Sequence, residues 1–161
     1  MFLAASKLPG RVLAGIAVAS FLSVALALVA QHGFGVRPCA WCVMQRLVFL
    51  LIGLAALLGW AMKGTPRKAL LLLVMLLAVA GIASAVFQHE VAAQMESCAM
   101  TLADRLNTAL ALEDRAPYLF MATASCAEAA AYRLLGLPYE VWSGLLFAAV
   151  FVAALLGLRR R

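Results

Sequence analysis

Residues 38–62 read PCAWCVMQRLVFLLIGLAALLGWAM. Proline favours the first turn of a helix, and the apolar residues 47–62 continue it far enough to approach the thickness of a membrane. A charged side chain at such a boundary is costly, so Arg46 indicates a function. This stretch predicts a membrane helix with a cysteine pair, Cys39 and Cys42, and an arginine at its mouth.

The whole chain is unusually apolar. Hydrophobic residues make up 66% of it and charged residues 12%, whereas a soluble domain is about half apolar. Four apolar runs are long enough to span a bilayer. We expect helices at about 12–30, 43–62, 69–87 and 141–158. The sequence therefore predicts an all-α membrane protein, in which one domain over residues 1–161 forms an antiparallel bundle of four transmembrane helices.

The first apolar run follows Lys7 and Arg11, an arrangement that secretory signal peptides share. A signal core has about 7–15 residues, and this run is longer. Three more apolar runs follow it, so we expect a transmembrane helix. Cleavage near residues 25–27 is the alternative.

Charges are divided between the two sides of the predicted bundle. Three acid-free segments carry basic residues: Lys7, Arg11, Lys63, Arg67, Lys68, Arg159, Arg160 and Arg161. All seven acids lie between Glu90 and Glu140. The positive-inside rule then places both termini in the cytoplasm and the connections at about 31–42 and 88–138 outside it. The net charge of +6 reflects this topology, and no nucleic-acid-binding motif is present, so we expect no nucleic-acid partner.

The long outer connection contains a segment, residues 100–112, with partly helical spacing of apolar residues. Leu102, Leu106 and Leu110 recur around Asp104 and Arg105. This pattern predicts a short amphipathic helix lying on the membrane surface. Packing against the outer ends of the transmembrane helices is the alternative.

All four cysteines, Cys39, Cys42, Cys98 and Cys126, fall on the outer side, where disulfides can form. Four cysteines allow three pairings. Cys39 and Cys42 are close enough for a local redox disulfide, and a bond between Cys98 and Cys126 would close a large loop. One pair beside lipid and one on a loop suggests electron transfer. Two static disulfides are the structural alternative. A zinc site would favour a second CxxC, so we expect no metal.

Arg46 and His89 are the candidate partners of a membrane-dissolved electron acceptor. Residues four apart share a helix face, so Arg46 would lie beside Cys42 and favour its thiolate, the nucleophile of disulfide exchange. Its guanidinium could also donate hydrogen bonds to a quinone carbonyl. His89, at the same membrane depth, could bind or protonate a quinone oxygen. The alternatives are an arginine reaching the head groups and an ordinary interfacial histidine.

The chain resembles the bacterial disulfide bond formation protein B (DsbB) family. The similarity lies in Pro38 to Arg46, in Gln88-His89, and in Cys126-Ala127-Glu128 followed by Leu135-Gly136-Leu137. The topology and the order of the cysteines also agree. The resemblance implies an enzyme of the bacterial inner membrane, a quinone-dependent protein-dithiol oxidoreductase that reoxidises a periplasmic DsbA-like thioredoxin-fold partner. Ubiquinone is the expected cofactor, with menaquinone as the alternative.

The resemblance also implies a role for each site residue. Cys98 would be attacked by the partner's thiol, and the released Cys126 would exchange with Cys39. Cys42 would contact the quinone. Arg46 would stabilise the thiolate and the quinone, with His89 assisting.

Two other functions remain open from the sequence. Vitamin K epoxide reductase-like proteins look similar, but their membrane CxxC follows the loop cysteines, whereas here it comes first. A non-enzymatic four-helix scaffold with two structural disulfides would need neither Arg46 nor a quinone.

Overall fold

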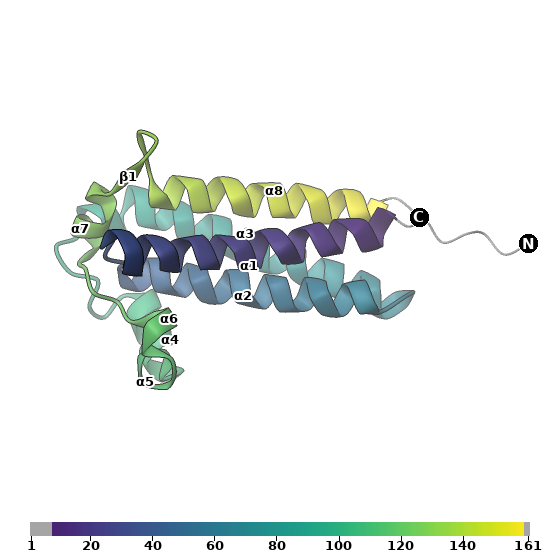
Figure 1. The fold of residues 1–161 in the computed structure, drawn as a ribbon, viewed down its shortest axis with the longest axis horizontal. Coiled ribbons are helices and arrows are strands. Elements are labelled where there is room, and N and C mark those ends of the chain that lie inside the picture. Colours follow the sequence, from purple (N-terminus) through teal and green to yellow (C-terminus); the bar gives the residue numbers. More distant parts are fainter. Residues whose placement is uncertain (1–7, 160–161) are drawn as a thin grey trace, which may run out of the picture.

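The computed structural model describes residues 8–159. Its four long helices are α1 (Leu8–Phe34), α2 (Ala40–Ala61), α3 (Thr65–Glu90) and α8 (Tyr139–Arg159). They lie side by side along the long axis of the molecule (Figure 1), and each is long and apolar enough to cross a membrane. The predicted fold class, an all-α bundle of four spanning helices, is confirmed. Lys7, Arg160 and Arg161, which contributed to the predicted orientation, lie outside the described residues.

The helices extend past the apolar runs at most ends, since polar residues at the membrane boundary continue the backbone hydrogen bonding. As a result, the first connection is much shorter than the predicted 31–42. Gly35 ends α1 with a φ of +67°, in the left-handed region that glycine tolerates, and α2 begins at Ala40. Cys42 therefore lies inside a helix, and Cys39 is its N-cap residue.

Apolar packing fills the interior of the bundle. The Phe147 ring of α8 stacks on Phe49 of α2, with ring centroids 4.0 Å apart. It also fits against Gly81 of α3, where an added Cβ would lie 2.5 Å from the ring. Large apolar side chains such as Val18 and Leu76 are exposed on the outside of the helices, as a surface in contact with lipid requires.

The long connection between α3 and α8 folds over one end of the bundle (Figure 1). It contains η1 (Ala92–Gln94), α4 (Leu102–Ala109), α5 (Leu112–Arg115), α6 (Pro117–Phe120), α7 (Cys126–Ala131) and a hairpin of β1 (Arg133–Leu134) and β2 (Leu137–Pro138). In the hairpin, Arg133 pairs with Pro138 and Leu134 with Leu137, antiparallel. Every element other than the four long helices lies at this end, which we call the cysteine end.

Helix α4 lies within the segment expected to be an amphipathic helix. It starts after Thr101, whose side chain accepts a hydrogen bond from the Asp104 backbone N–H. Asn107 is buried and donates a hydrogen bond to the Ala40 carbonyl of α2 at 3.0 Å, while Leu102, Leu106 and Leu110 are exposed. One face of α4 thus packs on the bundle, and the exposed leucines leave its placement in a membrane interface as a prediction.

Candidate redox centre and adjoining cavity

The cysteine pair at the start of α2 forms the centre of the site. The Cys39 thiol donates a hydrogen bond to the Cys42 sulfur over 3.5 Å. This bond, together with burial, raises the pKa of Cys39, so Cys39 keeps its proton while Cys42 accepts the bond. Cys39 is fully buried and Cys42 half-buried. The two thiols therefore differ in role, because Cys42 is the better placed to react as a thiolate.

Two buried amides lie at the cysteine pair: that of Gln88 contacts the sulfurs, and that of Gln45 contacts Gln88. Gln88 of α3 donates from Nε2 to the Cys42 sulfur at 3.3 Å and, more weakly, to the Cys39 sulfur at 3.7 Å. Gln45 donates to Gln88 Oε1 at 2.9 Å, which fixes the orientation of the Gln88 amide. A donor aimed at a sulfur stabilises its anionic form. The sequence singled out neither glutamine as a catalytic candidate.

The second cysteine pair, Cys98 and Cys126, forms a disulfide. Its two sulfurs and the Cys39 sulfur all lie within 4.8 Å of one another. Cys39 is thus placed between a disulfide on one side and Cys42 on the other. Three converging sulfurs also resemble a metal site, but the sulfurs of a disulfide are not thiolate ligands, and only Cys39 of the three is a free thiol.

Hydrogen bonds hold the loop that carries Cys126 against the start of α2. The Pro38 carbonyl accepts from the backbone N–H groups of Thr123 and Ala124 at 2.9 and 3.1 Å. Arg37 donates to the Thr123 carbonyl and lies 3.7 Å from Glu128. Ser125 and Glu128 form a capping box that starts α7 at Cys126. These contacts join the residues just before Cys39 to those on either side of Cys126. They explain why the disulfide lies beside Cys39.

Arg46 is 6% exposed. Its Nη1 donates to Gln31 Oε1 at 2.6 Å and to the Leu119 carbonyl at 2.8 Å. An arginine that reaches the lipid head groups would have an exposed guanidinium, whereas this one is turned into the protein and ties α1 and α6 to α2. Next to Leu119, Phe120 is buried, whereas Tyr118 and Met121 are exposed.

A cavity of about 540 Å³ adjoins the cysteine pair. It is bounded by α1, α2 and α8, and its polar lining includes Cys42, Gln45, Arg46 and Glu140. Most of the remaining lining is apolar and includes Leu26, which is exposed. The cavity therefore suits a mostly apolar molecule with a few polar atoms.

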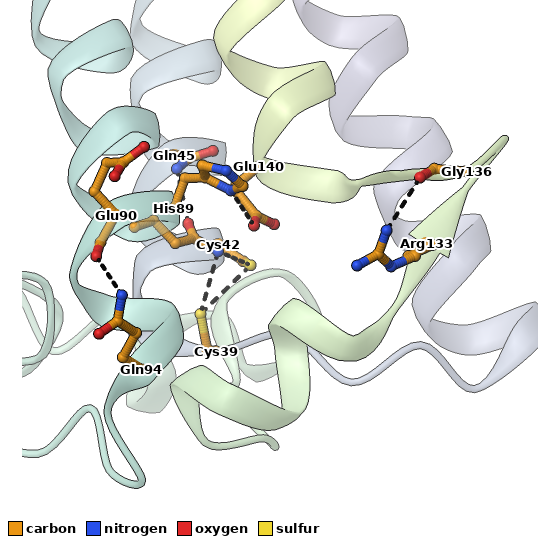
Figure 2. Close-up of polar contacts among 10 residues, drawn as sticks. Cys39, Cys42, Gln45, His89, Glu90, Gln94, Arg133, Gly136 and Glu140 are labelled. Atoms are coloured by element: carbon orange, nitrogen blue, oxygen red, sulfur yellow. Dashed lines mark hydrogen bonds and ion pairs between the residues drawn. The ribbon is translucent and has the colours of Figure 1, made fainter.

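His89 does not line this cavity and is connected to it by Glu140. Its Nδ1 is 3.2 Å from Glu140 Oε1 (Figure 2), and Glu140 lines the cavity while His89 does not. Glu140 was not a candidate from the sequence. An acidic residue at the start of an apolar run is costly for the same reason as Arg46. The same argument could therefore have identified Glu140 from the sequence.

Known proteins with similar sequences place the chain in a family. The profile of the family described as disulfide bond formation protein DsbB matches residues 9–157. The "Disulfide bond formation protein B" of Stutzerimonas stutzeri is 33% identical over 150 residues, which cover 88% of this chain and 90% of the relative. The protein of the same name from Cupriavidus necator is 34% identical over 147 residues, covering 91% and 90%.

A third relative, the "Disulfide bond formation protein B 1" of Pseudomonas aeruginosa, is 33% identical over 142 residues, covering 84% of this chain and 85% of its own length. The family profile, which matches residues 9–157, extends over all four long helices and the cysteine end. Together with the four helices able to span a membrane and the two adjoining cysteine pairs, they show that the chain is a multi-pass membrane protein of the disulfide bond formation protein DsbB family.

Proposed function

We propose that this protein is an oxidoreductase that generates disulfides in a periplasmic DsbA-like thioredoxin-fold protein and passes the electrons to a membrane quinone. The observation that carries the proposal is the position of the Cys39 sulfur. It lies within 4.8 Å of the Cys98–Cys126 disulfide and 3.5 Å from Cys42, which in turn lines the cavity. Sulfur atoms thus form a continuous path from the loop to the cavity.

The first steps are thiol–disulfide exchanges, in which each new S–S bond replaces an old one. A partner thiolate attacks Cys98 and releases Cys126 as a thiolate. Cys126 then attacks Cys39 of an oxidised Cys39–Cys42 pair and releases the Cys42 thiolate. The partner's second thiol displaces Cys98 and leaves as an oxidised protein. Cys98 then attacks Cys126, which restores the loop disulfide and leaves Cys39 and Cys42 reduced.

The last step needs a two-electron acceptor, which a bound quinone supplies. Oxidation of the Cys39–Cys42 dithiol to a disulfide releases two electrons and two protons, the number that conversion of a quinone to a quinol consumes. Gln88 stabilises the Cys42 thiolate by a direct hydrogen bond. Arg46, held by Gln31 and Leu119, contributes a fixed positive charge to the cavity wall.

The lining of the cavity fits such a group. A quinone has an apolar tail and two carbonyl acceptors, and the cavity combines an apolar wall with donors from Gln45 and Arg46. Ubiquinone is the first candidate and menaquinone the second.

For the orientation, we propose the bacterial inner membrane with the cysteine end in the periplasm and both termini in the cytoplasm. Lys63 lies in the turn between α2 and α3, and Arg67 and Lys68 lie in the first turn of α3, at the end opposite the cysteines. This distribution follows the positive-inside rule. An oxidising compartment is also the one in which disulfides persist.

The test combines purified protein, a reduced DsbA-like protein and a soluble quinone analogue. Quinone absorbance should fall as the partner is oxidised, and Cys42→Ser should abolish the fall. Cys126→Ser should trap the partner on Cys98, because the resolving exchange is lost. Trapping on Cys39 would contradict the assignment of Cys98 as the first contact. A scaffold with structural disulfides would show no quinone consumption.

A further inference from the structure

Glu140 has an unusual environment for a carboxyl group. Its side chain is 1% exposed and lies in the first turn of α8. Oε1 contacts His89, while Oε2 is buried with no hydrogen-bond partner among the described residues. A buried polar atom without a partner is unfavourable by about 1–3 kcal/mol. The position of this atom beside a cavity therefore indicates that it binds a ligand or transfers a proton.

His89 connects this buried carboxyl with the outside. Its side chain is 48% exposed, at the end of α3 that carries the loop. The imidazole has two nitrogens, so it can take a proton from water at Nε2 and release another from Nδ1. Since Nδ1 faces Glu140 Oε1, the pair forms a two-membered path from the cysteine-end surface to the cavity wall.

The charged groups around the cavity do not neutralise Glu140 directly. Arg46 of α2 and Arg37 of the first connection both line the cavity. Among the described residues, however, the ion pairs within 4.0 Å are His89 with Glu140 and Arg37 with Glu128. Arg46 is engaged by Gln31 and Leu119 instead. Glu140 is therefore the acidic group of the cavity, and His89 is its contact with the surface.

We propose that His89 and Glu140 form a proton relay that delivers a proton from periplasmic water to the electron acceptor in the cavity. This inference rests on the proposed function. His89 Nε2 takes up a proton from water, the resulting imidazolium gives its Nδ1 proton to the Glu140 carboxylate, and Glu140 transfers its proton to the acceptor. The relay operates once for each of the two protons that the quinol needs, and the two thiols release two protons to water on the same side. Protons and electrons therefore balance, and no proton crosses the membrane.

The relay gives His89 a different role from the direct quinone contact that the sequence suggested. Arg46 and Gln88 stabilise negative charge, whereas Glu140 supplies the proton. Without Glu140, electron transfer would still be favourable, but the acceptor would have to take its proton from a cavity with an apolar wall.

The test starts with protein in which Cys39 and Cys42 are reduced, mixed rapidly with a short-tailed ubiquinone analogue. Glu140→Gln keeps the size of the side chain and cannot carry the proton. We expect quinone reduction to slow about 100-fold, as loss of a general acid does. Glu90→Gln, which changes an exposed acid next to His89, is the matched control and should reduce the analogue as fast as the unchanged protein.

Two further measurements separate a relay from a structural role. Trp142 lines the cavity, so quenching of tryptophan fluorescence by the analogue reports binding without turnover, and its affinity in Glu140→Gln should change by less than about twofold if only a rate is affected. In addition, oxidised Glu140→Gln should oxidise one equivalent of reduced partner normally when no quinone is present.

His89→Ala tests the same relay independently should Glu140→Gln fail to fold. It should slow quinone reduction, and added imidazole should restore the rate. An unchanged rate in Glu140→Gln, an affinity loss that accounts for the slowing, or no rescue by imidazole would each overturn the relay. If the unchanged protein reduced no quinone, the proposed function would fall as well, which distinguishes the two failures.

Discussion

Inside the bundle, Gly81 allows the Phe147 ring to lie directly against α3. At the cysteine end, the loop combines a smaller cluster of buried residues, including Ala103, with separate hydrogen bonds to Pro38 and Ala40. Close apolar packing has few alternative arrangements. Individual hydrogen bonds contribute only about 1 kcal/mol each and can be exchanged for bonds to water. The difference suggests that the four long helices form a rigid frame, which fixes Cys42 and its cavity. The loop beside this frame can then release Cys126 during each exchange.

The largest expected effect tests the frame. Gly81→Val places a branched side chain where even a Cβ would lie 2.5 Å from the Phe147 ring. Overpacking of this kind destabilises by about 1–3 kcal/mol or more. Thermal unfolding in detergent should show the loss. Gly15→Ala is the control, because nothing lies within 4 Å of its added Cβ. Equal stability of the two variants would break the contrast between frame and loop.

The next effect tests the donor on the reactive sulfur. Gln88→Leu removes the 3.3 Å hydrogen bond to Cys42 and keeps a side chain of similar size. Hydrogen bonds to charged groups contribute about 1.5–3 kcal/mol, so alkylation of Cys42 by iodoacetamide at neutral pH should slow about tenfold or more. Gln94→Leu, an exposed change farther along the chain, should leave the rate unaltered. Faster alkylation in Gln88→Leu would contradict the assigned role.

A smaller effect is expected where α4 meets α2. Asn107→Ala removes the hydrogen bond to the Ala40 carbonyl and should weaken loop docking by about 1 kcal/mol. Protease cleavage within the loop should become faster while the melting temperature of the bundle stays nearly constant. Asn107→Asp serves as the matched variant, since it keeps the size and loses the donor. If the bundle melted together with the loop, frame and loop would be one cooperative unit.

The smallest effect concerns acid pH. The hydrogen bond from the Ser125 backbone N–H, followed by the charge of Arg37, lowers the pKa of Glu128. A carboxyl with a lowered pKa stabilises the folded loop above its ordinary pKa, and this contribution is lost as the pH falls through the folded value. Loop proteolysis should therefore accelerate slightly on acidification, and Glu128→Gln should abolish that dependence.

Much of this organisation could be predicted from the sequence. The apolar runs predicted four spanning helices, and residues 38–46 predicted a redox cysteine pair beside an arginine. Helix ends were less predictable, because hydropathy detects lipid contact and not the polar turns that continue a helix. The expectation that His89 contacts the acceptor stays a prediction. The sequence analysis did not consider Glu140, which contacts His89 and lines the cavity.

Hydropathy and charge act locally along the chain, so they were enough to predict four helices able to span a membrane, with the cysteines gathered at one end. The three-dimensional arrangement was needed to show that Cys39 lies within 4.8 Å of the Cys98–Cys126 disulfide, that Gln88 donates to Cys42 and that Glu140 contacts His89. These contacts join residues far apart in the chain, and their geometry depends on how each helix is rotated and where the loop docks, which no local pattern records.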